Sequence, residues 1–175
     1  MPDAKPPPTP HYIHLLRTTQ TIHVQLSQMA DQKASILMAA TFVIFTITIS
    51  QSKGAMPPLP LAILGGFAFL SAVLAMSAVM PVVGRPRRRQ AMPLNLLFFG
   101  SFTALDEGDY VERLREGLAS DDGVIALMAR DIYQNGQVLK RKKYRLLGWA
   151  YRVFLLGLTL SFAAFVWEVA GPHLP

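Results

Sequence analysis

The chain has 175 residues, of which 51% are hydrophobic, and a formal net charge of +6 at pH 7. It contains no cysteine, which excludes disulfides, thiolate metal sites and cysteine nucleophiles. Such a chain is too short and too apolar to be a soluble enzyme with a membrane anchor, so we expect a single membrane domain over residues 11–170.

The N-terminal part is predicted to be a short tail followed by one long helix. Residues 1–10 are rich in proline, and we expect them to be disordered. Residues 34–52 carry no charge and form the first predicted span, with 11–33 as its helical extension, so that one helix covers about 12–51. Apolar side chains recur every seven residues along this helix, as in a packed helical seam, at Leu15, Ile22, Met29 and Ile36.

Two further segments are apolar enough to cross a bilayer. Residues 54–84 are 31 uncharged residues in a row, and we place the second span at 61–80. Backbone groups in hydrocarbon must be paired within their own segment, so this span should be a helix. The third span is predicted at 147–168, where Arg152 lies near the start and its long side chain can reach the interface.

The segment 85–145 between the second and third spans is predicted to be mostly helical. An amphipathic helix is expected over 106–119, and a last helix over about 122–169, with Asp121 as its N-cap. The uncharged stretch 91–105 is too short to span, so we expect it to pack into this part or to lie at the interface. The predicted fold class is an all-α membrane protein: three transmembrane helices with a helical cytoplasmic bundle continuous with the first and third spans.

The basic residues predict the orientation in the membrane. The segment 85–145 holds 12 Lys or Arg against 8 Asp or Glu, and its basic residues cluster at both ends, close to the membrane. Positive charge next to a span marks the cytoplasmic side. The connection around Lys53 is short and nearly neutral. We therefore expect the N-terminus in the cytoplasm and the tail 171–175 outside.

Few residues are suited to catalysis or metal binding. The chain has no glycine-rich phosphate loop, and the histidines of the first helix lack a further ligand at metal spacing. We therefore expect neither an enzyme nor a metal site. Asp31 and Lys33 are set two residues apart at the mouth of the first span, on different helix faces. Either both reach up to the interface, or Asp31 faces a basic partner within the bundle.

Three short stretches, in this order, resemble the membrane effectors of Pycsar anti-phage systems, the PycTM-type domain. They are Ala-Asp-Gln-Lys-Ala at 30–34, Pro-Leu-Asn-Leu-Leu-Phe-Phe-Gly at 93–100, and Asp-Ile-Tyr at 131–133 together with Lys143 and Tyr144. The resemblance covers roughly residues 20–170. The second stretch departs from the expected Asn-Pro beside Leu-Phe-Phe-Gly, which leaves the role of Asn95 open.

The resemblance implies an antiviral effector in the bacterial inner membrane, activated by a cyclic pyrimidine nucleotide, cCMP or cUMP. A partner pyrimidine nucleotide cyclase would make this ligand, and activation would impair the membrane and arrest growth. Apart from the ligand no cofactor is expected, and the expected partners are the lipid bilayer, the cyclase and further copies of the chain, with no nucleic acid. Three spans cannot enclose a water path alone, so any pore must be a homo-oligomer.

A cyclic phosphate needs a basic, partly dry pocket with hydrogen-bond donors, and a base needs amide or aromatic contacts. The candidate ligand-binding residues are Arg17, Asp31, Lys33, Asn95, Phe98, Phe99, Arg130 and Lys143. An alternative function keeps the fold without the ligand: a membrane scaffold or accessory subunit whose basic cytoplasmic face binds anionic lipid or a partner protein.

Overall fold

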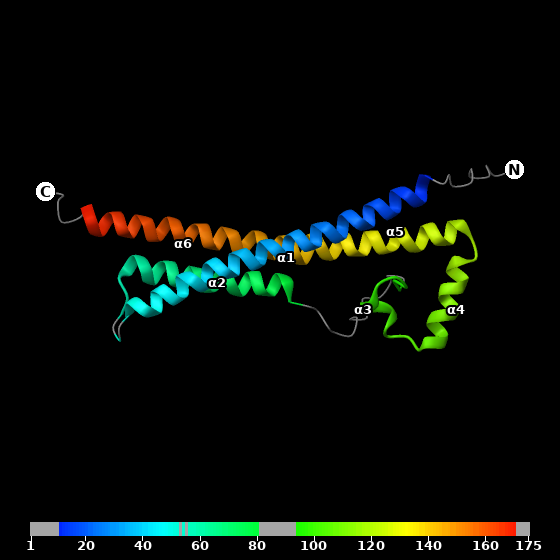
Figure 1. The fold of residues 1–175 in the computed structure, drawn as a ribbon, viewed down its shortest axis with the longest axis horizontal. Coiled ribbons are helices and arrows are strands. Elements are labelled where there is room, and N and C mark those ends of the chain that lie inside the picture. Colours follow the sequence, from blue (N-terminus) through cyan, green and yellow to red (C-terminus); the bar gives the residue numbers. More distant parts are fainter. Residues whose placement is uncertain (1–10, 53, 55, 81–93, 171–175) are drawn as a thin grey trace. The chain divides into compact units, whose positions relative to one another are not determined.

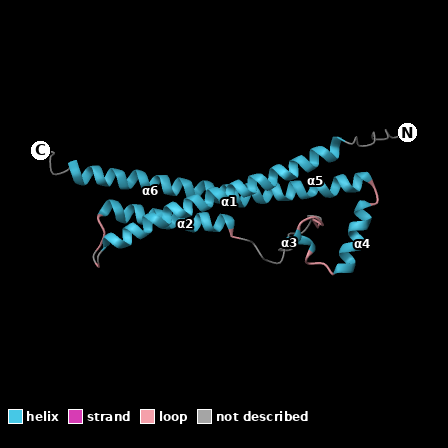
Figure 2. Ribbon diagram, in the orientation of Figure 1, coloured by secondary structure: helices cyan, strands magenta, loops and turns pink. Residues whose placement is uncertain are grey.

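The computed structural model describes residues 11–52, 54, 56–80 and 94–170, and every element in these residues is helical (Figures 1 and 2). The elements are α1 (His11–Ser52), α2 (Leu59–Val79), α3 (Phe99–Phe102), α4 (Glu107–Leu118), α5 (Asp121–Val138), a π-helical segment (Leu139–Tyr144) and α6 (Arg145–Ala170). The predicted disordered tail 1–10, the basic residues between 85 and 89 and the tail 171–175 lie outside the described residues.

Three of these helices are long and apolar enough to cross a membrane, which confirms the predicted fold class. They are α1, α2 and the continuous helix Asp121–Ala170 that α5, the π-helical segment and α6 form together. The predicted continuity of the first and third spans with helices outside the membrane is therefore also confirmed. In each case the uncharged run occupies one end of a helix that extends well beyond it.

The predicted N-cap of α5 is wrong by one residue. Ser120, rather than Asp121, precedes the helix in an extended conformation, and its hydroxyl accepts a hydrogen bond from the Gly123 backbone N–H at 3.1 Å. A serine hydroxyl at this position satisfies one of the free N–H groups of the first turn. Asp121 is the first helical residue, where its charge still interacts favourably with the helix dipole.

The chain forms two compact units. The first unit consists of Met1–Leu26 and Pro81–Leu139, and the second consists of Ser27–Met80 and Lys140–Pro175. In the first unit, residues 94–105 pack with the helices: Asn95 and Leu96 are buried, although α3 itself is only one turn long. This supports the packed alternative for the predicted stretch 91–105, of which 91–93 lie outside the described residues.

The second unit is held together by small residues that let its helices approach closely. Its buried cluster combines residues of α1, α2 and α6, namely Ala30, Ala34, Leu37, Ala75, Ala78, Leu147 and Ala150. Gly157 of α6 lies against Phe67 of α2 so closely that an added Cβ would overlap the phenylalanine side chain. The Ser71 hydroxyl donates to the carbonyl of Ala150 at 2.9 Å, so this buried polar group is paired.

Helix α1 packs against its own chain along one stripe, which we call the inner stripe. Its members are buried or half-buried and recur every three or four residues: Leu16, Gln20 and His23 in the first unit, then Ser27, Ala30, Ala34, Leu37 and Thr41 in the second. The apolar positions that the sequence predicts as a seam, from Leu15 to Ile36, lie on the opposite face and are 46–63% exposed. That seam therefore does not pack against the part of the chain that the structure describes.

Candidate functional site

The first unit contains a buried carboxylate surrounded by amide groups. Asp131 of α5 is 7% exposed, and it accepts hydrogen bonds from Gln20 Nε2, Asn95 Nδ2 and Asn135 Nδ2, each at 3.0 Å. A buried charge without partners would cost several kcal/mol, and these three donors offset that cost. We call these four residues the amide cluster.

Three separate segments bring the amide cluster together. Asn135 lies one helical turn after Asp131 on α5, and Gln20 belongs to the inner stripe of α1. Asn95 precedes α3, and its side-chain oxygen also accepts from the Leu97 N–H at 3.0 Å, which closes a turn around it. Asn95 thus fastens the segment before α3 to α5, and this structural role answers the question that the sequence left open.

The second unit contains an ion pair between α1 and the π-helical segment. Lys143 Nζ lies 2.7 Å from both carboxylate oxygens of Asp31 and 2.7 Å from the Ser27 hydroxyl. The side chains of Lys143 and Asp31 are 21% and 46% exposed, so water and ligands can reach the pair. Of the two alternatives for Asp31, the basic partner within the bundle is confirmed.

The π-helical segment places two successive lysines on different helices. Lys143 bonds to α1, as described, and Lys142 Nζ donates to the carbonyl of Met80, just beyond the end of α2. A π-helix has a wider turn than an α-helix and changes the direction of the side chains that follow, and such segments are frequent at functional sites. Lys142 and Lys143 therefore connect α6 to both other apolar helices of this unit.

The remaining predicted ligand residues are placed as follows. Arg17 and Lys33 are exposed on α1, and the Lys33 carbonyl accepts from the Tyr151 hydroxyl at 3.2 Å. Arg130 Nη1 donates to the Leu94 carbonyl at 3.4 Å. The rings of Phe98 and Phe99 lie 5.0 Å apart between centroids, with an interplanar angle of 50°.

Among the candidate ligand residues, the structure thus brings together Asp31 with Lys143 and Phe98 with Phe99. Arg17, Asn95, Phe98, Phe99 and Arg130 belong to the first unit; Asp31, Lys33 and Lys143 belong to the second.

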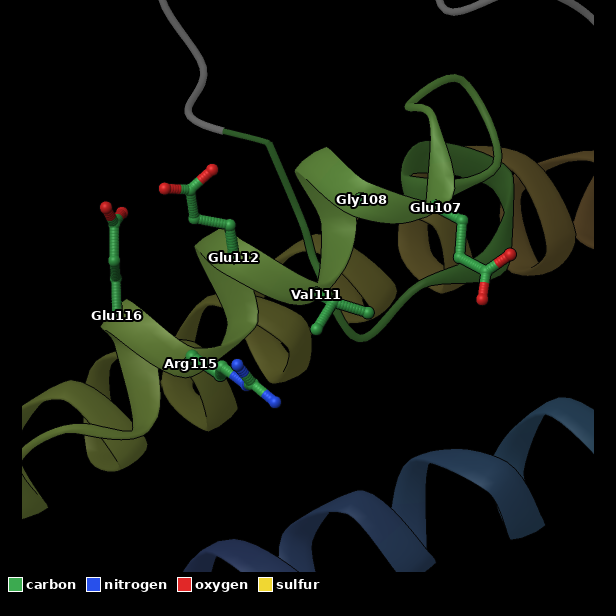
Figure 3. A pocket seen from close by; sticks show the side chains of 6 residues that line it. All are labelled: Glu107, Gly108, Val111, Glu112, Arg115 and Glu116. Carbon is green, nitrogen blue, oxygen red and sulfur yellow. The ribbon is translucent and has the colours of Figure 1, made fainter.

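A hollow on the surface of α4 is a poor site for an anionic ligand (Figure 3). Its lining residues all come from this one helix, so it is a shallow feature of the surface: Glu107, Gly108, Val111, Glu112, Arg115 and Glu116. The lining carries three carboxylates and one guanidinium, and the net negative charge would repel a phosphate. In the part of the chain that the structure describes, no group of three His, Cys, Asp or Glu could hold a metal ion.

Sequence reasoning missed the centre of the amide cluster. Asp131 belongs to the third stretch that carries the family resemblance, but it is not among the candidate site residues, and neither are Gln20, Asn135 and Ser27. One signal was present: Asp131 lies one turn after Leu127, on the face by which α5 packs. A charged residue on the packed face of a helix needs partners, and amide side chains are the natural ones when no lysine or arginine is close.

The fold and these contacts define an all-helical membrane protein with three apolar helices and two polar contact groups outside their apolar runs. A family model described as the Pycsar effector protein domain matches residues 14–169, and the chain belongs to this family of antiviral defence effectors. No curated protein and no solved structure matches the chain. The motifs that carried the resemblance meet in the structure: Asp31 pairs with Lys143, and Asn95 with Asp131.

Proposed function

We propose that this protein is a non-enzymatic anti-phage effector that a cyclic pyrimidine nucleotide, cCMP or cUMP, switches on. A partner pyrimidine nucleotide cyclase would supply the ligand during infection, and activation would impair the inner membrane and stop growth. The observation that carries the proposal is the family match over residues 14–169 in a chain with three helices suited to cross a membrane.

Continuous helices offer a route from ligand to membrane. Helix α1 and the helix Asp121–Ala170 each extend from a polar segment into an apolar run without interruption. A ligand shifts a protein between two states only by its differential affinity for them. A nucleotide that prefers one arrangement of the polar segments would thereby also select the state of the apolar runs that belong to the same helices.

Three basic residues are the proposed candidate contacts for the cyclic phosphate: Arg17 and Lys33, which are exposed, and Arg130, which is half-buried. Charge-assisted hydrogen bonds to phosphate are about twice as strong as neutral ones, which favours Arg17 and Arg130 as donors in the first unit, or Lys33 as a donor in the second. Phe99 is 68% exposed and is proposed to stack on the base. Asn95 and Asp31 are proposed as positioning residues, because their polar atoms already bond to Asp131, Leu97 and Lys143.

The proposed location is the bacterial inner membrane, with the N-terminus in the cytoplasm and the C-terminus outside. The excess of Lys and Arg beside the second and third apolar runs supports this orientation. It places the amide cluster and the Asp31–Lys143 pair on the side where the nucleotide is made. Any pore would need several copies of the chain.

The test is binding of labelled cCMP and cUMP to the purified protein in detergent, with cAMP and cGMP as controls. We expect saturable binding of one pyrimidine nucleotide, and membrane depolarisation when the protein is co-expressed with an active pyrimidine cyclase. Absence of binding together with absence of depolarisation would contradict the proposal. That outcome would favour a scaffold or accessory subunit whose basic face binds anionic lipid.

A further inference from the structure

Helix α1 carries a second stripe on the side opposite to the inner stripe, and we call it the outer stripe. In heptad notation its a positions are Leu15, Ile22, Met29, Ile36 and Val43. Its d positions are Thr18, Gln25, Gln32, Ala39 and Thr46. All ten residues are exposed, whereas the residues of the inner stripe are buried or half-buried. The inner stripe already packs α1 onto its own chain, so the outer stripe is left for something outside the described residues.

The outer stripe contains no charged residue. Helix α1 has 42 residues, and its charges are confined to Arg17, Asp31 and Lys33, all of them off the stripe. Helix α4 shows the composition of a solvent-exposed helix in this chain, because half of its 12 residues, EGDYVERLREGL, are charged. The outer stripe has the composition of a helix contact rather than of a solvated face.

Lipid can cover only part of the outer stripe. Ile36 and Val43 belong to the predicted first span, where hydrocarbon would surround them. Leu15 lies 19 residues before residue 34, which is about 28 Å along a helix at 1.5 Å per residue, and Ile22 lies 12 residues before it. A partner helix would cover the residues that the bilayer does not reach, and a strict seven-residue repeat is the spacing at which two helices stay in contact as a left-handed supercoil.

We propose that the outer stripe is a self-association surface, along which α1 helices of two or more copies pack in parallel and in register. Copies inserted in one membrane share the same orientation, so their α1 helices run parallel. In such a packing each a or d residue meets its own counterpart, and any charge would face a like charge. An uncharged stripe fits a second copy of this chain for that reason, and it would be an unusual choice for a partner recognised by opposite charge.

The polar d positions are compatible with this packing. A glutamine amide is both donor and acceptor, so Gln25 and Gln32 can each hydrogen-bond to the same residue of the neighbouring copy. A buried polar residue in a coiled coil lowers stability but fixes the register. The apolar a positions supply the burial, and the two glutamine layers supply the alignment. The inference goes beyond the proposed function, because it requires neither nucleotide nor cyclase.

The absence of cysteine from the chain allows a direct test by disulfide cross-linking. Ile22→Cys at an a position, Gln25→Cys at a d position and Val24→Cys at the outward c position are compared in the full chain, in native membranes under mild oxidation. A disulfide needs Cα atoms roughly 4.4–6.8 Å apart, a distance that facing a or d residues satisfy and c residues do not. We expect cross-linked dimers from the variants at 22 and 25, and at least severalfold fewer from Val24→Cys, although Val24 is 56% exposed.

A charge placed on the outer stripe provides the second arm of the test. In the Ile22→Cys background, Gln25→Glu sets two carboxylates against each other, and we expect cross-linking to fall severalfold. Val24→Glu in the same background is the matched control and should leave it unchanged. Three outcomes would overturn the proposal. They are equal cross-linking at positions 22, 24 and 25, no cross-linking at any of them, and a yield of cross-linked dimer that Gln25→Glu does not change. None of these readouts depends on ligand binding, so they fail or succeed separately from the proposed function.

Discussion

Lys143 lies 2.7 Å from both carboxylate oxygens of Asp31, a residue 112 positions earlier in the chain. The pair joins α6 to α1 through the π-helical segment, and the Ser27 hydroxyl shares the same ammonium group. Exposed ion pairs contribute about 0–1 kcal/mol to stability, whereas removing one partner of a buried pair costs more because the other charge is left unpaired. This pair, with side chains 21% and 46% exposed, lies between these limits.

The first prediction concerns the strength of this pair. Lys143→Ala and Asp31→Ala should each lower the melting temperature of the purified protein in detergent, and a double-mutant cycle should give a coupling energy of about 1 kcal/mol. Lys140→Ala serves as the control, because Lys140 is a neighbouring exposed lysine. A coupling energy of zero would mean that the pair does not hold α6 to α1.

The second prediction concerns the amide cluster. Asn95→Ala removes a donor from the buried Asp131 carboxylate and an acceptor from the Leu97 N–H, and each lost bond to a buried group costs on the order of 1–3 kcal/mol. We expect faster amide hydrogen exchange over residues 94–105 and a lower melting temperature. Asn95→Asp should be more damaging still, because it sets a second carboxylate against Asp131. Unchanged exchange in both variants would contradict the anchoring role of Asn95.

The third prediction uses two glycines of α6 as a matched pair. Gly157→Ala puts a Cβ where Phe67 already lies, and the obstruction is the fixed Cβ end of that side chain, so the backbones of α2 and α6 must move apart. We expect a loss of roughly 1–3 kcal/mol in stability, as in other overpacked cores. Gly148→Ala has open space around the new methyl group and should be neutral or slightly stabilising. Equal changes in stability at both positions would show that helix propensity, rather than packing, determines the effect of the substitution.

The fourth prediction concerns topology. A reporter that works only in the cytoplasm, fused after Glu107, should be active, because the positively charged segment around it is retained on that side. The same reporter fused after Gly171 should be silent. The reverse pattern would move the amide cluster and the basic residues to the other side of the membrane and would remove the proposed ligand from their reach.

The spans were predictable from the sequence, because they depend mainly on the length of an uncharged, apolar run. An uncharged run of the right length has few alternatives to a membrane helix, and the absence of proline and glycine between Leu15 and Ile36 predicted the continuity of α1. For Asp31 the sequence left two alternatives open, and the one with a basic partner did not identify Lys143. Pairing over 112 residues depends on how the helices pack, and periodicity within one helix carries no information about that.

The packed face of α1 was not predictable, for a physical reason. The outer stripe has the larger side chains, Leu15, Ile22 and Met29, and so gives the stronger periodic signal. The inner stripe packs through Ala30 and Ala34, which are small residues that hydropathy counts weakly but that let helices approach closely. Periodicity shows that a helix has a contact face; it does not say whether the contact is within the chain or with another copy.

The last prediction concerns the trigger and Lys33. This exposed lysine lies just before the uncharged run of α1. Its backbone carbonyl accepts a hydrogen bond from the Tyr151 hydroxyl, and a change of the side chain would spare this bond. Lys33→Ala should therefore leave membrane insertion and melting temperature unchanged. If Lys33 holds the cyclic phosphate, the variant should bind labelled cCMP or cUMP roughly tenfold more weakly, which corresponds to the loss of one charge-assisted hydrogen bond. Asp31→Ala tests positioning, because it releases Lys143 without removing a cation. Wild-type affinity in Lys33→Ala, measured with protein of unchanged stability, would exclude this lysine from the site and direct the search to Arg17 and Arg130.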